Sequence, residues 1–241
     1  MQRFYITDNM ICDGKITVCG DDANHISKVL RLKEGESILF CDGKNTDYYC
    51  IIENAEKSMV VAKIEKTEQN NTEPPISITL YQSIPKSDKM EYIIQKCVEL
   101  GVKKIVPVDA KRCVARLKDD KKLARWQKIA DEAAKQCGRG ERVTVEKPVP
   151  FKEAILKPDE NVLKIIPYEN EKDGNLKNIL NENNANEFAV YIGPEGGFDD
   201  LEIEMALKND VHSVTLGPRI LRTETAPIAV ISAIMYELGD W

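Results

Sequence analysis

The chain has 241 residues, of which 42% are hydrophobic, and its formal net charge is −6. This length and composition predict a globular protein of one large or two modest domains. No apolar stretch is long enough for a signal peptide or a membrane span, and none of the seven cysteines belongs to a CxxC pair. We therefore expect a cytoplasmic protein with reduced thiols and without a membrane anchor, a disulfide framework or a metal site.

The charge is unevenly distributed along this acidic chain. Residues 103–142 contain 13 lysines and arginines against 6 aspartates and glutamates, a local excess of +7. A basic stripe of this kind suits the binding of one polyanion, and it equally suits a solvated helix face.

The first part of the chain is strand-like. Short apolar runs such as ESILFCDG and DYYCIIENAEKSMVVAKIEK are separated by turn signals at 13–14, 33–35 and 42–43, which predicts a small β-rich domain. The polar stretch TEQNNTEPP at 67–75 is typical of a linker. We place the two domains at residues 1–70 and 75–241.

Strands and helices alternate beyond the predicted linker. Strands are expected at 76–84, 103–110, 162–168, 188–193 and 213–217, and helices begin near Asp88, Asp119, Asp199 and Pro227. Alternation of this kind predicts an α/β fold, with a mostly parallel sheet and helices on both faces.

Two of the helices have clear apolar stripes. In the helix from Asp88, that residue and Glu91 are placed as a capping pair and Gly101 as a stop. The core positions are expected to be Met90, Ile93, Ile94, Cys97 and Val98 in that helix, and Leu123, Trp126, Ala130, Ala133 and Cys137 in the helix from Asp119.

In a parallel sheet, ligands bind beyond the carboxyl ends of the strands, so the loops after strands are candidate sites. Three of these loops stand out: KIIPYENEKDG, GPEGGFDD and LGPRILRTETAP. The GPEGG stretch lacks the Lys and Ser/Thr of a phosphate loop and the spacing of a dinucleotide loop. Because Glu195 would repel a phosphate, this loop better suits a neutral or cationic ligand with ribose hydroxyls and an adenine edge.

Residues 189–198 and 214–226 closely resemble two motifs of the SPOUT, or α/β-knot, methyltransferases. GPEGGF with LGPRILRTET resembles the ribosomal small-subunit methyltransferase E family. RFYI and HISKVLRLKEGESILFCDG are similar to the PUA-like β-barrel of that family, and PKSDKMEYIIQKCVELGVKKIVPV and DEAAKQCGRGERVTVEKP to its first knotted segments. Pro227 departs from the small helix former expected there.

This resemblance implies a C-terminal SPOUT trefoil-knot domain after a small PUA-like β-barrel that binds RNA. It also implies S-adenosylmethionine-dependent methylation of N3 of a uridine, usually numbered 1498, in the 16S rRNA of the 30S small ribosomal subunit. Homodimers that pair through the apolar C-terminal helix are a further implication. The implied cofactor-binding residues are Ile166, Pro167, Gly193, Pro194, Glu195, Gly196, Gly197, Leu216, Gly217, Ile220, Leu221 and Thr223.

The chemistry of uracil N3 limits the catalytic roles. N3 carries a proton and is a poor nucleophile until that proton is lost, so the site must accept the proton or stabilise the anion. Glu224 is the candidate base and Arg222 the candidate cation, although an ion pair within the loop would explain both residues equally well. The candidate RNA contacts are Arg3, His25, Lys28, Arg31, Arg139 and Arg142.

Three alternatives remain open at the level of sequence. A SPOUT enzyme acting on another nucleotide fits the same motifs. A non-enzymatic RNA-binding module explains the barrel and the basic stripe but leaves the glycine and proline loops without a purpose. A different nucleotide-dependent enzyme explains those loops but lacks phosphate motifs.

Overall fold

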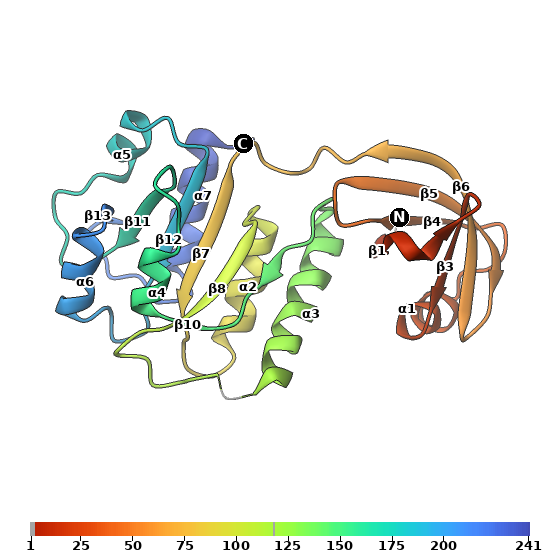
Figure 1. Cartoon of the computed structure of the whole chain (residues 1–241), viewed down its shortest axis with the longest axis horizontal. Coiled ribbons are helices and arrows are strands. Elements are labelled where there is room, and N and C mark those ends of the chain that lie inside the picture. Colours follow the sequence, from red (N-terminus) through yellow and green to blue (C-terminus); the bar gives the residue numbers. More distant parts are fainter. Residues whose placement is uncertain (1–2, 118) are drawn as a thin grey trace. The chain divides into compact units, whose positions relative to one another are not determined.

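The structure is a computed structural model that describes residues 3–117 and 119–241. The chain divides into two compact units (Figure 1). The first unit runs to Glu73 and includes Ala134–Arg142, and the second consists of Pro74–Ala133 and Val143–Trp241. The last turn of one helix therefore belongs to the first unit, although it lies far along the sequence.

The first unit is a curled six-stranded sheet with the strand order β1-β4-β5-β6-β3-β2. Its one parallel pair is β1 with β4, and its other neighbours are antiparallel. The β-rich fold predicted for this part of the chain is thus confirmed. The elements are β1 (Arg3–Tyr5), η1 (Asp8–Met10), β2 (Ile11–Cys12), β3 (Lys15–Cys19), α1 (Asp21–Asn24), η2 (His25–Val29), β4 (Ser37–Cys41), β5 (Thr46–Ala55) and β6 (Met59–Gln69).

Most of the segment predicted as a linker, residues 67–73, belongs to the first unit. Strand β6 extends to Gln69 and pairs with the start of β5. Beyond it, Asn70 is buried and donates to the carboxylate of Asp47, and Glu73 pairs with Arg139. The polar composition of this segment suggested a linker, but its side chains form hydrogen bonds and ion pairs with residues that are distant in the sequence. Composition alone does not reveal such partners.

The second unit is built on an all-parallel sheet with the strand order β10-β8-β7-β12-β11-β13, and β9 pairs with β8. The α/β fold class predicted from the alternation is confirmed. The knotted chain path that the resemblance implies stays a prediction. The strands are β7 (Ser77–Ser83), β8 (Lys104–Asp109), β9 (Thr144–Val145), β10 (Val149–Pro150), β11 (Leu163–Pro167), β12 (Glu187–Ile192) and β13 (Val211–Val214).

Helices cover both faces of this sheet (Figure 1). Helices α4 and α6 pack on one face, where the stacked rings of Tyr81 and Tyr191 lie 4.8 Å apart. Helix α7 packs against β12 and contacts both α2 and α5. The helices are α2 (Lys89–Glu99), α3 (Asp120–Cys137), α4 (Phe151–Leu156), α5 (Leu176–Glu182), α6 (Asp200–Leu207) and α7 (Ala226–Leu238).

Four short elements of the second unit, namely α4, α5, β9 and β10, were not predicted from the sequence. The helices have six and seven residues and the strands two each, too few for a periodic pattern to emerge. The sequence analysis also placed the last strand too late, since β13 ends at Val214 rather than continuing to 217.

The predicted stripes of α2 and α3 are correct in outline. All five core positions of α2 are buried, and Trp126 of α3 is fully buried. The capping pair predicted for α2 is wrong, because Asp88 makes no side-chain capping bond and Glu91 instead pairs with Arg125 at 2.8 Å. Helix α6, by contrast, begins with a complete capping box formed by Asp199 and Glu202.

Candidate functional site

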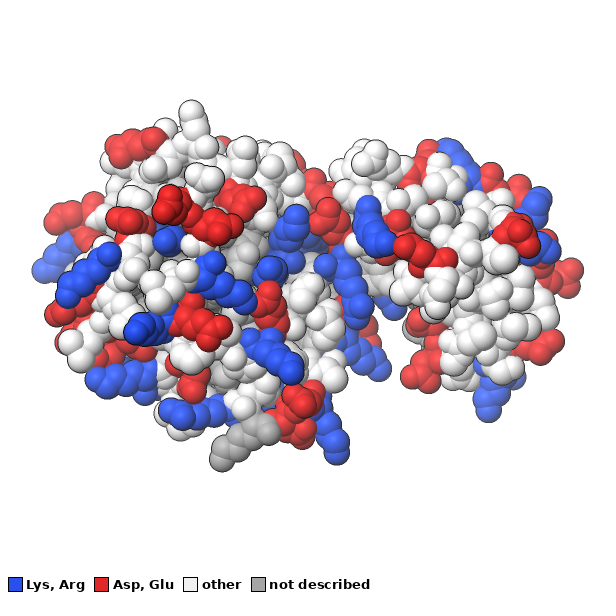
Figure 2. Space-filling view, viewed as in Figure 1, with Lys and Arg blue, Asp and Glu red and all other residues white. Residues whose placement is uncertain are grey.

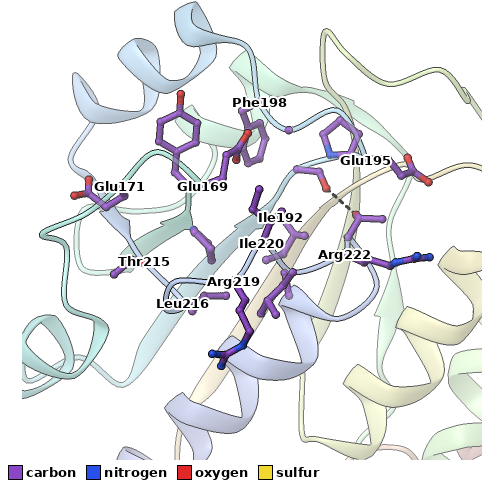
Figure 3. A pocket seen from close by; sticks show the side chains of 18 of the residues that line it. Glu169, Glu171, Ile192, Glu195, Phe198, Thr215, Leu216, Arg219, Ile220 and Arg222 are labelled. Atoms are coloured by element: carbon purple, nitrogen blue, oxygen red, sulfur yellow. Dashed lines mark hydrogen bonds between the residues drawn. The ribbon is translucent and has the colours of Figure 1, made fainter.

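The carboxyl ends of β12, β11 and β13 lie side by side, because these strands are neighbours in a parallel sheet. The loops that follow them form one cavity of about 950 Å³ in the second unit (Figure 3). This volume falls within the range of small-molecule sites. The cavity is lined by Lys89, Pro167, Tyr168, Glu169, Glu171, Lys172, Ile192–Phe198, Thr215–Thr223 and Ala226.

The GPEGG loop, residues 193–197, forms the first wall. Gly197 has a φ of +67°, and an added Cβ would overlap the carboxylate of Glu169. A Cβ at Gly193 would lie 3.2 Å from the ring of Phe198. Backbone conformation and close approach therefore call for glycine at 197, and tight packing favours it at 193. The third glycine, Gly196, has room for a side chain and accepts a hydrogen bond from Arg112 at 3.1 Å.

The second wall is the loop 215–225, which carries the RILRTET sequence. It is joined to the first wall by two linked hydrogen bonds, one of which is drawn in Figure 3. Gln82 donates from Nε2 to the hydroxyl of Thr223 at 3.1 Å, and that hydroxyl donates to the carbonyl of Gly193 at 2.7 Å. Gln82 is fully buried and Thr223 is 6% exposed, so the bond between them is shielded from water, whereas the bond to Gly193 is partly buried.

The third side is the loop after β11, residues 167–175. Its shape is held by Glu171, which accepts hydrogen bonds from the backbone NH groups of Lys172, Asp173 and Gly174, each at 3.0 Å. The bonds from Asp173 and Gly174 lower the pKa of this carboxyl, so Glu171 is ionised near neutral pH.

Lys89, in the first turn of α2, forms ion pairs with the carboxylates of Glu195 at 3.3 Å and Glu224 at 3.1 Å. Partial burial acts to raise the pKa of Glu224. Its hydrogen bonds with backbone and Lys89 and the positive charges of Lys89 and Arg222 outweigh that effect and lower the pKa. Glu224 is therefore a weaker base than an ordinary glutamate, and its role as proton acceptor stays a prediction.

The structure brings most of the predicted cofactor residues together. Eleven of the twelve line the cavity, and the exception is Ile166. Its side chain is fully buried among the core residues of the α4 and α6 face, because it lies inside β11, whereas Pro167 ends that strand. Of the two predicted catalytic residues, Arg222 lines the cavity and Glu224 does not.

The sequence analysis missed Lys89, Glu169 and Gln82 at this site. It considered the loops after β11, β12 and β13 but not the segment after β7. Strand β7 is the other neighbour of β12 and runs parallel to it, so its carboxyl end lies at the same edge of the sheet. The segment PKSDK, residues 85–89, follows β7 and is therefore also a candidate site beyond the carboxyl end of a parallel strand, which would have included Lys89.

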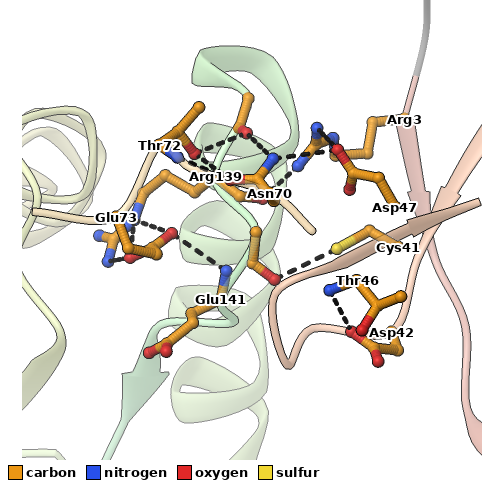
Figure 4. Close-up of polar contacts among 12 residues, drawn as sticks. Arg3, Cys41, Asp42, Thr46, Asp47, Asn70, Thr72, Glu73, Arg139 and Glu141 are labelled. Carbon is orange, nitrogen blue, oxygen red and sulfur yellow. Dashed lines mark hydrogen bonds and ion pairs between the residues drawn. The ribbon is translucent and has the colours of Figure 1, made fainter. Parts of the chain in front are cut away.

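The predicted RNA contacts fall into two groups, all within the first unit. Arg3 and Arg139 are buried, with side chains 8% and 5% exposed, and they pair with Asp47 and Glu73 (Figure 4). These carboxylates and the surrounding packing hold both arginines, which gives them a structural role in place of a phosphate contact. The exposed group consists of His25, Lys28, Arg31 and Arg142.

The basic excess at 103–142 is largely neutralised in the fold. Arg125 pairs with Glu91, Lys111 with Asp199 and Arg116 with Asp109. Basic and acidic side chains accordingly alternate over the visible surface of the second unit (Figure 2).

Neither a metal centre nor a membrane helix is found in the described part of the chain. Over residues 3–117 and 119–241, no three or more His, Cys, Asp and Glu side chains are grouped to hold a metal ion. The helices of these residues are all too short or too polar to span a bilayer. The seven cysteines are free thiols.

Two family models match the chain. One, described as an RNA methyltransferase domain, matches residues 72–235, and the other, described as an RNA methyltransferase PUA domain, matches residues 18–65. With the parallel α/β fold and the cavity at its strand ends, these matches define an RNA methyltransferase, and the chain belongs to that class.

Individual relatives identify the family within the class of RNA methyltransferases. The Ribosomal RNA small subunit methyltransferase E of Bacillus subtilis is 34% identical to this chain, and the alignment covers 98% of this chain and 97% of that protein. The protein of the same name from Mesomycoplasma hyopneumoniae is also 34% identical, over 96% of this chain and 98% of that protein. The crystal structure of the enzyme of that name from Neisseria gonorrhoeae, bound to S-adenosyl methionine, matches with a TM-score of 0.89 and 35% identity over 100% of this chain and 99% of that one. The protein belongs to the ribosomal RNA small subunit methyltransferase E family.

Proposed function

We propose that this protein transfers a methyl group from S-adenosylmethionine to N3 of a uridine in the 16S rRNA of the 30S subunit. The observation that carries the proposal is the single cavity formed by the GPEGG and RILRTET loops and closed by the bond between Thr223 and Gly193. The full-length relationship to small-subunit rRNA methyltransferases supports it, and the uridine and its N3 atom rest on the family resemblance. An rRNA substrate places the protein in the cytoplasm.

The residues of the cavity fit S-adenosylmethionine. Gly193, Gly196 and Gly197 present backbone without side chains to the cavity that they line, and Ile192 and Leu221 add apolar side chains that suit an adenosyl group. The carboxylates of Glu169 and Glu195 suit a ligand with a positive charge and ribose hydroxyls. When bound, the cofactor supplies an electrophilic methyl group on a sulfonium.

Arg222 is the proposed catalytic residue on the RNA side. It lines the cavity, its side chain is exposed, and Figure 3 shows it extending away from the glycine loop. A fixed cation beside uracil stabilises negative charge on the carbonyl oxygens and so favours loss of the N3 proton. Because the pKa of Glu224 is lowered, we assign that residue to loop structure and the N3 proton to solvent.

We predict that Arg222→Ala lowers the single-turnover rate of methyl transfer by about 100-fold or more, because the positive charge of Arg222 acts in the transition state. The affinity for S-adenosylhomocysteine should change little. Arg222→Lys should rescue poorly, because an ammonium cannot present two coplanar donors.

Glu224→Gln should keep the wild-type dependence of rate on pH. If that variant loses the rise of rate with pH, Glu224 is the base.

The substrate is tested with ribosomes from a strain that lacks the gene. Nucleoside analysis of its 16S rRNA should show loss of one 3-methyluridine, and the purified protein should restore it. Parallel assays on free 16S rRNA and on 30S subunits identify the preferred form. Loss of a different methylated nucleotide would keep the enzyme class and overturn the proposed target.

The RNA-binding part of the proposal concerns the first unit. The residues Lys28, Arg31 and Arg142 are exposed there, and Arg31 has a φ of +56° that fixes the local chain direction. These side chains are the proposed phosphate contacts. Arg31→Ala should weaken binding of 16S rRNA and reduce its salt dependence, while affinity for S-adenosylhomocysteine stays the same.

We further propose that the protein is a homodimer through α7. One side of this helix is buried in the second unit, and the other carries small residues together with Tyr236, which is 73% exposed. Tyr92 of the neighbouring helix α2 is 49% exposed. Such an apolar surface is typical of an interface between subunits.

The dimer predicts that Tyr236→Glu produces a monomer in light scattering at micromolar concentration. Leu207→Glu is the matched control, because Leu207 is 52% exposed at the end of α6, on the opposite face of the sheet. A wild-type monomer with full activity would contradict this proposal.

A further inference from the structure

One cation joins two walls of the cavity. The Nζ atom of Lys89 lies 3.3 Å from Oε1 of Glu195 and 3.1 Å from Oε2 of Glu224. Glu195 belongs to the GPEGG loop and Glu224 to the RTET sequence, so Lys89 contacts segments that follow two different strands. The backbone NH of Lys86 also donates to Oε1 of Glu195 at 3.0 Å, which fixes that carboxylate beside the start of α2.

The three charged side chains are partly shielded from water. Their exposed fractions are 31% for Lys89, 29% for Glu195 and 21% for Glu224. Both carboxylates lie within 3.3 Å of the same nitrogen, so without Lys89 two negative charges would repel each other across the gap between the loops. Lys89 therefore replaces a repulsion between these two carboxylates with two attractive contacts.

The neutral bonds deeper in the unit do not replace this contact. Gln82 and Thr223 connect the bases of the two loops through a buried bond between them and a partly buried bond from Thr223 to Gly193. Lys89 acts nearer the surface, and it lines the cavity itself. The loops are thus joined at two depths, by hydrogen bonds inside and by an ionic contact outside.

We propose that Lys89 is a positioning residue that holds Glu195 and Glu224 together and so sets the separation of the GPEGG and RTET loops required for cofactor binding. The link to the cofactor rests on the function proposed above, whereas the effect on the loops does not. Lysine suits the role, because an ammonium has three donors around one point charge and can serve two carboxylates from different directions.

The test compares Lys89→Met with Lys96→Met in the full chain. Lys96 lies in the same helix, pairs with Glu99 at 2.9 Å and is 34% exposed, but it is absent from the cavity lining. Both substitutions remove one lysine charge from α2 and keep an unbranched side chain of similar length. Lys89→Arg restores the positive charge.

The first measurement is hydrogen exchange without ligand. We expect faster exchange in Lys89→Met at the amides of Lys86, which donates to Glu195, and of Gly197 and Thr225, which close turns in the two loops. Lys96→Met should exchange there like the wild type. Wild-type exchange in Lys89→Met would overturn the inference whether or not the protein binds the cofactor.

The second measurement is calorimetric titration with S-adenosylhomocysteine. Affinity should fall about three- to tenfold in Lys89→Met, as two partly screened ion pairs are lost, and Lys89→Arg should recover most of it. Lys96→Met should stay within about twofold, since Lys96 pairs with Glu99 of its own helix and with neither loop. If the wild type binds and Lys89→Met binds equally well, the positioning role is wrong, and if the wild type fails to bind, the proposed function is wrong.

Discussion

At the scale of single residues, neighbouring glycines in one motif have different physical requirements. Gly197 has a φ of +67° and lies against the carboxylate of Glu169. At Gly196 an added Cβ would come no closer than 3.7 Å to Arg112, which is ordinary contact. The sequence GPEGG does not distinguish the two positions, because the difference arises from the loop after β11 that faces one of them.

This contrast predicts that Gly197→Ala lowers the free energy of unfolding by about 1–2 kcal/mol, the cost of placing a side chain in left-handed backbone. It should also weaken binding of S-adenosylhomocysteine, because Glu169 must move within the cavity. Gly196→Ala is the control for stability and should leave the free energy of unfolding nearly unchanged. Equal effects of the two substitutions in urea unfolding would contradict this account.

At the scale of elements, buried ion pairs hold together parts of the first unit that are distant in sequence. Asp47 of β5 accepts from Arg3 of β1 at 2.7 Å and from Asn70, just beyond β6, at 3.0 Å (Figure 4). Arg3 also donates to the carbonyl of Arg139, at 2.7 Å. One carboxylate therefore joins three elements of the unit.

We predict that Asp47→Ala lowers the free energy of unfolding by about 3–5 kcal/mol, since it leaves the buried guanidinium of Arg3 without its anion. Asp8→Ala removes the pair with Lys44, whose side chains are 74% and 68% exposed, and should cost less than about 1 kcal/mol. Urea unfolding followed by circular dichroism measures both. A small effect of Asp47→Ala would show that the pair contributes little to this unit.

At the scale of the whole molecule, several carboxyl groups have pKa values below their ordinary range. For Glu171, backbone hydrogen bonds are the main cause. For Glu146, Glu195 and Glu224, partial burial opposes the shift, and hydrogen bonds and ion pairs with lysines outweigh it. The folded state therefore binds these protons less readily than the unfolded chain, so folding and protonation are coupled.

The sign of this coupling predicts acid sensitivity. A carboxyl with a lowered pKa stabilises the fold above its unfolded value, 4.5 for glutamate, and that contribution is lost as the pH falls through the lowered value. The urea midpoint should stay nearly constant between about pH 6 and 5 and fall below about pH 4.5. Glu171→Gln should show a shallower fall, and a midpoint that rises on acidification would contradict the prediction.

The sequence by itself determined the α/β class and the strand ends that carry the site, because alternation, helix periodicity and glycine-rich loops are local signals. The twelve cofactor residues came from the family resemblance, and eleven of them line the cavity. Only the tertiary structure decided which charges act on each other. It placed Lys89 between Glu195 and Glu224, which lowers the pKa of Glu224, and it buried Arg3 and Arg139 against carboxylates. Such pairings depend on the order of strands and on burial, which a linear sequence leaves open.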